Sequence, residues 1–129
     1  MNGDKNYILD TNILIYYFEG KISLDAIFKT ATFIGISIVS YIEFLGYAKL
    51  SKEDISKFNA FVKLITVIEL PILKTHHDFY DLVISIKRKH KIKLPDCLIV
   101  GQAVSNDCIL ISNDNQLGNI KNLKLLKYD

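Results

Sequence analysis

Short apolar runs alternate along this chain with longer segments whose apolar residues recur every three or four positions. The short runs are β-prone and are bounded by polar residues, glycine or proline, a pattern typical of strands. They predict strands over residues 7–9, 33–38, 66–70, 108–111 and 123–126. The strand over 66–70 is expected to end at Pro71, because proline cannot donate to a ladder.

The segments between these runs predict helices. One is expected to begin near Thr11 and to stop before Gly20, and another is expected to be capped by Ser51. Pro95 predicts a further helix, since proline is preorganised for a first turn. A brief helical turn is expected around Leu117. The remaining helical patterns cover residues 23–31, 40–49, 75–90 and 96–105, and the segment after Ser51 continues to residue 65.

Strands that alternate with helices favour an α/β fold. Parallel neighbours need crossover connections, so the pattern predicts a three-layer α/β/α sandwich with a central, mainly parallel sheet. The chain has 129 residues, half of them hydrophobic, which fits one domain over residues 1–129 with a substantial core. In such sheets, ligand sites gather beyond the carboxyl ends of the strands.

Composition narrows the picture further. The first ten residues lack the regions of a signal peptide, and no apolar run reaches the ~20 residues that cross a bilayer, so we expect a cytoplasmic protein with no membrane partner. Cys97 and Cys108 lie in apolar surroundings without zinc-site spacing, which predicts two small buried side chains. The net charge of +2 is too small to indicate nucleic-acid binding by itself.

Four acidic residues follow predicted strands or open predicted helices. Asp10 and Asp114 lie just past strands, and Glu43 and Asp96 lie in the first turns of helices. All four can converge on one sheet edge, where each pair at about 4 Å would cost roughly 4 kcal/mol at an effective dielectric of about 20. A cation should therefore lie among them. Oxygen ligands suit Mg²⁺ or Mn²⁺, which indicates metal-dependent phosphodiester hydrolysis.

Each acid also has a purely structural interpretation. Asp10 can cap the helix that follows it. Ser40 and Glu43 have the spacing of a capping box, in which the glutamate bonds back to the backbone of the serine. Asp96 is a common kind of first-turn acid, and Asp114 lies in a turn rich in asparagine. The four positions taken together favour the shared pocket.

The order of these motifs resembles that of the PIN-domain nucleases, in particular the toxin subunits of bacterial and archaeal VapBC toxin–antitoxin pairs. The resemblance covers roughly residues 6–127. It rests on four segments in the right order: Ile8-Leu9-Asp10-Thr11-Asn12, Ser40-Tyr41-Ile42-Glu43, Pro95-Asp96-Cys97-Leu98-Ile99 and Ile111-Ser112-Asn113-Asp114.

This resemblance implies the roles of several residues. Asp10, Glu43, Asp96 and Asp114 would bind the metal and carry the catalysis. Thr11, Asn12 and Ser112 would be polar neighbours that orient carboxylates or water. Ser112 stands where these nucleases often have threonine, and neutral asparagines flank Asp114 on both sides. The resemblance also implies an RNA substrate, a cognate antitoxin protein and a homodimer.

Two further patterns each keep two interpretations. The basic stretch contains Lys87, Arg88, Lys89, Lys91 and Lys93. It is either an RNA-binding border of the acidic pocket or a solvated helix end. The aromatic residues of the early helices form either core or a groove for the antitoxin; they are Tyr16, Tyr17, Phe18, Phe44, Tyr47, Phe58 and Phe61.

Two other functions compete with the nuclease. A receiver-like signalling domain is another small α/β fold with a magnesium-binding acidic site. It is disfavoured because the chain has no adjacent acidic pair near the first strand and no lysine directly after a late strand. A catalytically silent PIN-like module that only binds RNA or protein would keep the same fold, but the complete set of four acids disfavours it.

Overall fold

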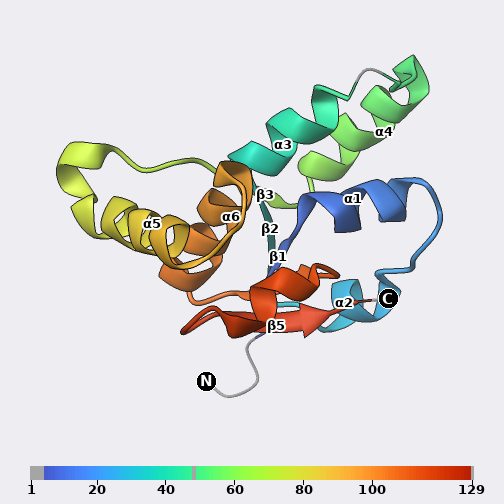
Figure 1. Cartoon of the computed structure of the whole chain (residues 1–129). Helices are drawn as coiled ribbons and strands as arrows, with labels where there is room; N and C mark the ends of the chain where they lie inside the picture. Colours follow the sequence, from blue (N-terminus) through green and yellow to red (C-terminus); the bar gives the residue numbers. More distant parts are fainter. Residues whose placement is uncertain (1–4, 48, 129) are drawn as a thin grey trace.

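Five strands form the centre of the computed structural model, which describes residues 5–47 and 49–128. They lie in the order β3-β2-β1-β4-β5, and all of their pairings are parallel (Figure 1). Ile8 at the centre of β1 pairs with Gly35 on one side and Leu110 on the other. The strands are β1 (Asn6–Leu9), β2 (Phe33–Ser37), β3 (Thr66–Ile68), β4 (Ile109–Ser112) and β5 (Lys124–Lys127).

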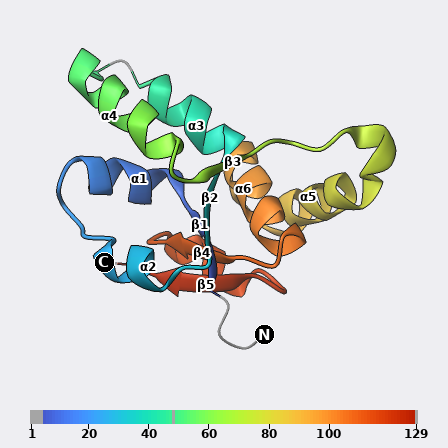
Figure 2. The ribbon, with the colours of Figure 1, turned by 180° about the vertical axis from the view of Figure 1, so that it is seen from behind.

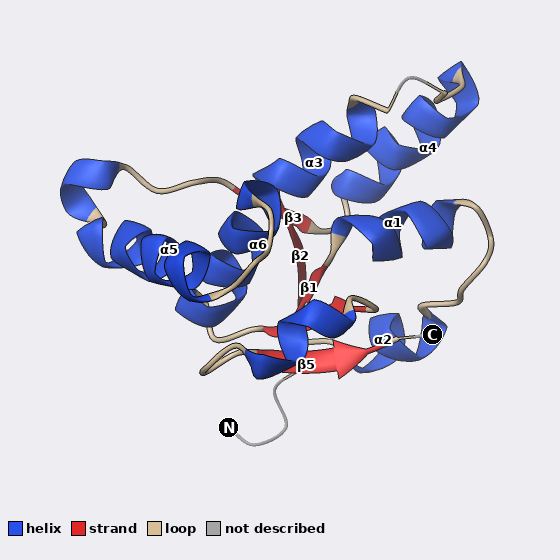
Figure 3. Cartoon of the chain, viewed as in Figure 1, coloured by secondary structure: helices blue, strands red, loops and turns tan. Residues whose placement is uncertain are grey.

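Helices cover both faces of this sheet, as Figures 2 and 3 show. One layer contains α1 (Thr11–Phe18), α2 (Asp25–Thr30), α3 (Ile38–Leu45) and α4 (Lys52–Val62). The other contains α5 (His77–Lys89) and α6 (Leu94–Ser105). Two 3-10 helices, Leu73–Thr75 and Asn115–Asn119, complete the elements. The predicted three-layer α/β/α fold is confirmed.

The core is divided between the two faces because strand side chains alternate in direction. Ile8 packs with the α5 and α6 layer, whereas Tyr7 and Leu9 pack with the α1 to α4 layer. In the α5 and α6 layer, Gly101 permits close approach of α6 to α5, since a Cβ there would lie 2.7 Å from Val83 Cγ2. Within residues 5–47 and 49–128, no helix combines the length and apolarity needed to cross a membrane.

Packed aromatic rings fill much of the α1 to α4 layer. Phe44 and Phe58 stack with centroids 4.1 Å apart, and Phe18 lies 5.2 Å from Phe44. Phe44 and Phe58 are buried, so the core interpretation is confirmed for them. Tyr47 differs, because 49% of its surface is exposed.

The largest difference from the expected boundaries concerns α3, which was predicted over 40–49. It begins at Ile38, because Ser37 and not Ser40 is the N-cap and accepts a hydrogen bond from the Val39 N–H at 3.0 Å. Gly46 ends it. The capping-box interpretation of Ser40 and Glu43 is therefore wrong, and Glu43 lies in the second turn of the helix rather than the first.

Candidate active site

Asp10 follows β1 directly, and hydrogen bonds fix both its backbone N–H and its carboxylate. Its backbone N–H donates to the Ile111 carbonyl at 3.0 Å, which extends the β1–β4 ladder. The Thr11 N–H donates to Oδ1 at 2.8 Å, and the Ser112 hydroxyl donates to Oδ2 at 2.7 Å. Asp10 is thus the N-cap of α1, as its structural interpretation required. It is only 8% exposed, which is a costly position for a carboxylate that served as a cap alone.

Glu43 is exposed on α3 and is bound by a hydroxyl from α1. Thr11 Oγ1 donates to Glu43 Oε1 at 2.7 Å and also lies 2.8 Å from Ser40 Oγ. Because the single hydroxyl proton of Thr11 is used on the carboxylate, Ser40 must donate to Thr11. Ser40 is fully buried, one turn before Glu43 on the same helix. The sequence indicated Ser40 only as a helix cap and missed this contact.

Asp96, from α6, and Asp114, from the turn after β4, complete the acidic group. Asp96 is the third residue of α6, after Pro95, and is half-buried. Asp114 caps the 3-10 helix after β4, where its Oδ1 accepts from the Gln116 N–H at 2.9 Å. The Asp114 N–H donates to Ser112 Oγ at 3.1 Å. One buried hydroxyl therefore connects Asp10 and Asp114.

Burial and the negative charges of the neighbouring acids raise the pKa values of two of the four carboxyl groups, Asp10 and Asp96. Burial is the largest cause that raises the pKa of Asp10; the hydrogen bonds from Ser112 and Thr11 oppose it, and the charges of Asp114 and Glu43 add to the rise. Burial also comes first in raising the pKa of Asp96 from 3.8 to about 6, followed by the charges of Asp10, Asp114 and Glu43. The four predicted acids thus lie near the carboxyl edge of the sheet, where the charges of the other three act on Asp96.

A family model for the PIN domain matches residues 7–123 of the chain. The chain belongs to the PIN domain family. A comparison with curated proteins gives no match.

Solved structures resemble the fold of this PIN domain closely. A chain of VapBC2 from Rickettsia felis, bound to a DNA fragment from the promoter, is 24% identical with a TM-score of 0.78; 95% of this chain and 98% of that chain are covered. DNA-bound VapBC from Salmonella typhimurium gives 18% identity and 0.79 over the same shares of the two chains. A toxin–antitoxin complex from Klebsiella pneumoniae gives 20% and 0.75, over 94% and 96%. At these identities the similarity concerns the fold.

The acids of this PIN domain carry negative charge that no ion pair compensates within the described part of the chain. The ion pairs there join Lys21 to Glu19, Lys57 to Glu53 and Lys124 to Asp107. Across residues 5–47 and 49–128, no three acidic, histidine or cysteine side chains are close enough to hold one ion directly. An oxygen-only donor set of this kind fits a hydrated Mg²⁺, which keeps several waters and uses one or two carboxylates.

The remaining residues that the sequence singled out lie around or away from the acids. Asn12 is exposed in the first turn of α1, and its role stays a prediction. Lys93 precedes α6, and its charge lowers the pKa of Asp96, so this end of the basic stretch borders the acids. Cys97 and Cys108 are free, buried thiols, as expected.

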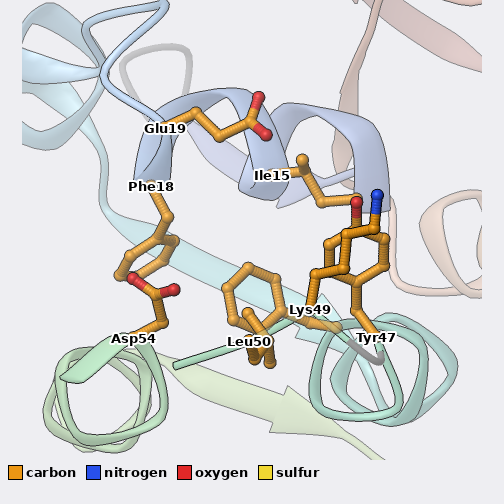
Figure 4. Close-up of a pocket in the computed structure, with 8 residues that line it drawn as sticks. Ile15, Phe18, Glu19, Tyr47, Lys49, Leu50 and Asp54 are labelled. Carbon is orange, nitrogen blue, oxygen red and sulfur yellow. The ribbon is translucent and has the colours of Figure 1, made fainter. Parts of the chain in front are cut away.

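A largely apolar pocket of about 280 Å³ lies between the carboxyl-terminal half of α1 and the end of α3 with the segment that follows it. Ile15 and Phe18 of α1 face Tyr47 and Leu50, which follow α3, across this space (Figure 4). None of the four acids lines it. Charged side chains at its rim come from Glu19, Lys49 and Asp54.

Proposed function

We propose that this PIN domain is a metal-dependent endoribonuclease that hydrolyses RNA phosphodiester bonds and is the toxin of a toxin–antitoxin pair. The observation that carries the proposal is the mutual electrostatic field of Asp10, Glu43, Asp96 and Asp114 at the carboxyl edge of the sheet. We assign these four residues as the metal-binding set for a hydrated Mg²⁺ or Mn²⁺, with one or two carboxylates bound to the ion directly and the others bound through its waters. Family membership supports the assignment independently.

The roles of the side chains follow from their contacts. A divalent cation at this site would supply positive charge beside the scissile phosphate and make an attacking water more acidic. The Ser112 hydroxyl keeps the Asp10 carboxylate turned toward the site, and Thr11 does the same for Glu43. Asp96 accepts no hydrogen bond from a described side chain and is free to adjust to the ion. Asn12 is assigned as a polar neighbour of the incoming phosphate or water.

A cognate antitoxin is the proposed protein partner. Similar folds occur in solved VapBC and toxin–antitoxin complexes. The pocket between α1 and the end of α3 offers apolar surface, including half-exposed Tyr47, that such a partner would cover. We also propose that the protein forms a homodimer, since exposed Ile72, Leu73 and Ile84 offer apolar surface that a second copy would cover. The proposed location is the cytoplasm.

The decisive experiment is RNA cleavage by the purified protein with and without its acids. Parent protein should cut single-stranded RNA with Mg²⁺ or Mn²⁺ and stop when a chelator is added. Asp10→Asn and Asp96→Asn should each reduce the rate by at least about 100-fold. Asp81→Asn on the exposed face of α5 is the matched control and should cut as fast as the parent.

Equal rates in the parent and both pocket variants would contradict the proposal. RNA binding without cleavage by the parent, at any concentration of either metal, would instead indicate a silent PIN-like module. Circular dichroism of each variant checks that the fold is retained.

A further inference from the structure

A continuous basic segment lies between the two helices of the α5 and α6 layer. We call it the basic loop; it comprises the last turn of α5 and the connection to α6, residues 87–93, with five cations and no acid. It encloses a surface depression of about 520 Å³. Lys87 Nζ donates to the Ile92 carbonyl at 3.0 Å, which closes the loop on itself. The other four cations, on Arg88, Lys89, Lys91 and Lys93, are exposed.

None of these cations is neutralised by a carboxylate in the part of the chain that the structure describes. The three ion pairs present there use Lys21, Lys57 and Lys124, which lie on other elements. Like charges gathered on a seven-residue segment repel one another. The basic loop therefore carries a concentrated positive field that is available to an external anion.

The helix dipole explains only the first half of this segment. Arg88 and Lys89 lie in the last turn of α5, where positive charge interacts favourably with the negative end of the helix. Lys91 lies outside both helices, and Lys93 is the N-cap residue of α6, with no side-chain capping bond. A cation is disfavoured at that positive end. The helix dipole thus gives no reason for lysine at either position.

The position of the loop relative to the acids supplies such a reason. Asp96 is the third residue of α6, three positions after Lys93, and the charge of Lys93 acts on it directly. An RNA strand with one phosphate at the acidic group would therefore lie within reach of a strongly positive segment at the start of α6. Phosphate contacts of this kind position a strand without reading its sequence.

We infer that the basic loop binds the RNA backbone beside the cleaved bond, with Lys91 and Lys93 contacting phosphates. This inference rests on the proposed function and adds to it how the substrate strand is held. The alternative occupant, an acidic segment of a partner protein, is separated from RNA by the experiment below.

The test measures how RNA affinity depends on salt. The probe is a fluorescein-labelled single-stranded RNA of mixed sequence, bound in the presence of chelator and followed by anisotropy from about 50 to 200 mM KCl. The variant is Lys91→Gln/Lys93→Gln. Its matched control, Lys29→Gln/Lys121→Gln, removes two exposed charges that precede β2 and β5, at the opposite edge of the sheet.

Each lost phosphate contact should reduce the slope of log affinity against log salt by about 0.7, so the loop variant should lose about 1.4. Its affinity at the lowest salt should fall on the order of tenfold. The control variant should retain the parent slope within about 0.3. In single-turnover cleavage, the loop variant should need more protein than the parent for half-maximal rate.

A parental salt slope in the loop variant would overturn the inference, as would loss of antitoxin binding with RNA binding intact. Failure of the proposed function looks different, because the parent would then bind RNA with a slope that depends on Lys91 and Lys93 but would not cut it. Unchanged melting temperatures in both variants show that the affinities are compared between folded proteins.

Discussion

Neutralising Asp96 should stabilise the metal-free protein, although it removes a proposed catalytic group. Burial, and then the charges of Asp10, Asp114 and Glu43, raise the pKa of Asp96 to about 6. The folded state therefore binds this proton more tightly than the unfolded state. Asp96→Asn removes the cost of ionising the group and breaks no side-chain hydrogen bond in the described structure.

The expected change in the free energy of unfolding combines the pKa shift, its reduction by solvent screening, and the loss of a helix-dipole interaction. A rise from 3.8 to about 6 corresponds to about 3 kcal/mol without screening. Asp96 is half-buried, so solvent screening reduces this to about 1.5 kcal/mol. The lost attraction between the carboxylate and the positive end of α6 removes about 0.5 kcal/mol more. The variant should be about 1 kcal/mol more stable at pH 7.5, or about 4 °C in melting temperature.

The sign of the pH dependence is fixed by the same shift. The folded protein favours the protonated form of Asp96, because the folded pKa is raised. The stability that this protonation gives is fully present below pH ~4 and is lost as the pH rises through about 6. Thermal unfolding in chelator should therefore give nearly equal parent and variant stabilities at pH ~4 and a growing advantage of the variant up to pH ~7. Saturating Mg²⁺ should stabilise the parent more than Asp96→Asn.

Two results would refute this reasoning. One is a variant that is less stable than the parent at pH 7.5 in chelator. The other is a stability difference that does not change between pH ~4 and ~7. Asp81→Asn, exposed on α5, controls for the general loss of one negative charge and should show no such pH dependence.

Three further changes test the contacts that support the site and the fold. Ser112→Ala removes the buried hydroxyl that connects two acids and should cost about 2 kcal/mol in denaturant unfolding, while Ser112→Thr should retain activity. Ser40→Ala should lower kcat about tenfold to 100-fold with little change in KM, because the hydroxyl that orients Glu43 loses its donor, and Ser40→Thr should restore kcat. Gly101→Ala places a Cβ 2.7 Å from Val83 Cγ2, and overpacking of about 1–3 kcal/mol should exceed the gain in helix propensity of about 1 kcal/mol, so a thermal melt should show a lower midpoint.

The sheet and the acidic quartet could be predicted from sequence because both depend on local order along the chain. A buried strand followed by a polar residue places that residue at the carboxyl edge, whatever the rest of the fold. Asp10 after β1 and Asp114 after β4 follow this rule. Asp96 was located by Pro95, which restricts where a helix can begin.

The details of α3 could not be predicted in the same way. Ser37 and Ser40 are both suitable caps, and the choice between them depends on where β2 ends. Ser37 still pairs with Ile68 of β3, so the strand continues to Ser37 and the helix begins directly after it. Pairing between segments about 30 residues apart in sequence therefore decided the cap. Ser40 was left free to contact Thr11.

The role of Gln102 in the core could not be predicted from the sequence either. It is fully buried in α6, where sequence alone suggests an apolar position. Its Nε2 donates to the Ile68 and Glu69 carbonyls at 3.0 and 3.3 Å, which secures the end of the edge strand β3. Those partners lie more than 30 residues earlier in the chain, and no local pattern indicates them.

The hydrogen bonds of the site divide its acids into two kinds. Asp10, Glu43 and Asp114 each accept a hydrogen bond from a hydroxyl or a backbone N–H, which offsets part of the repulsion and fixes their oxygens. Asp96 has only burial and three negative neighbours acting against its charge, with Lys93 as the opposing cation. A ligand cation would therefore give Asp96 the direct partner that it lacks among the described side chains. The charge that makes Asp96 unfavourable in the free protein would thus become favourable once metal binds.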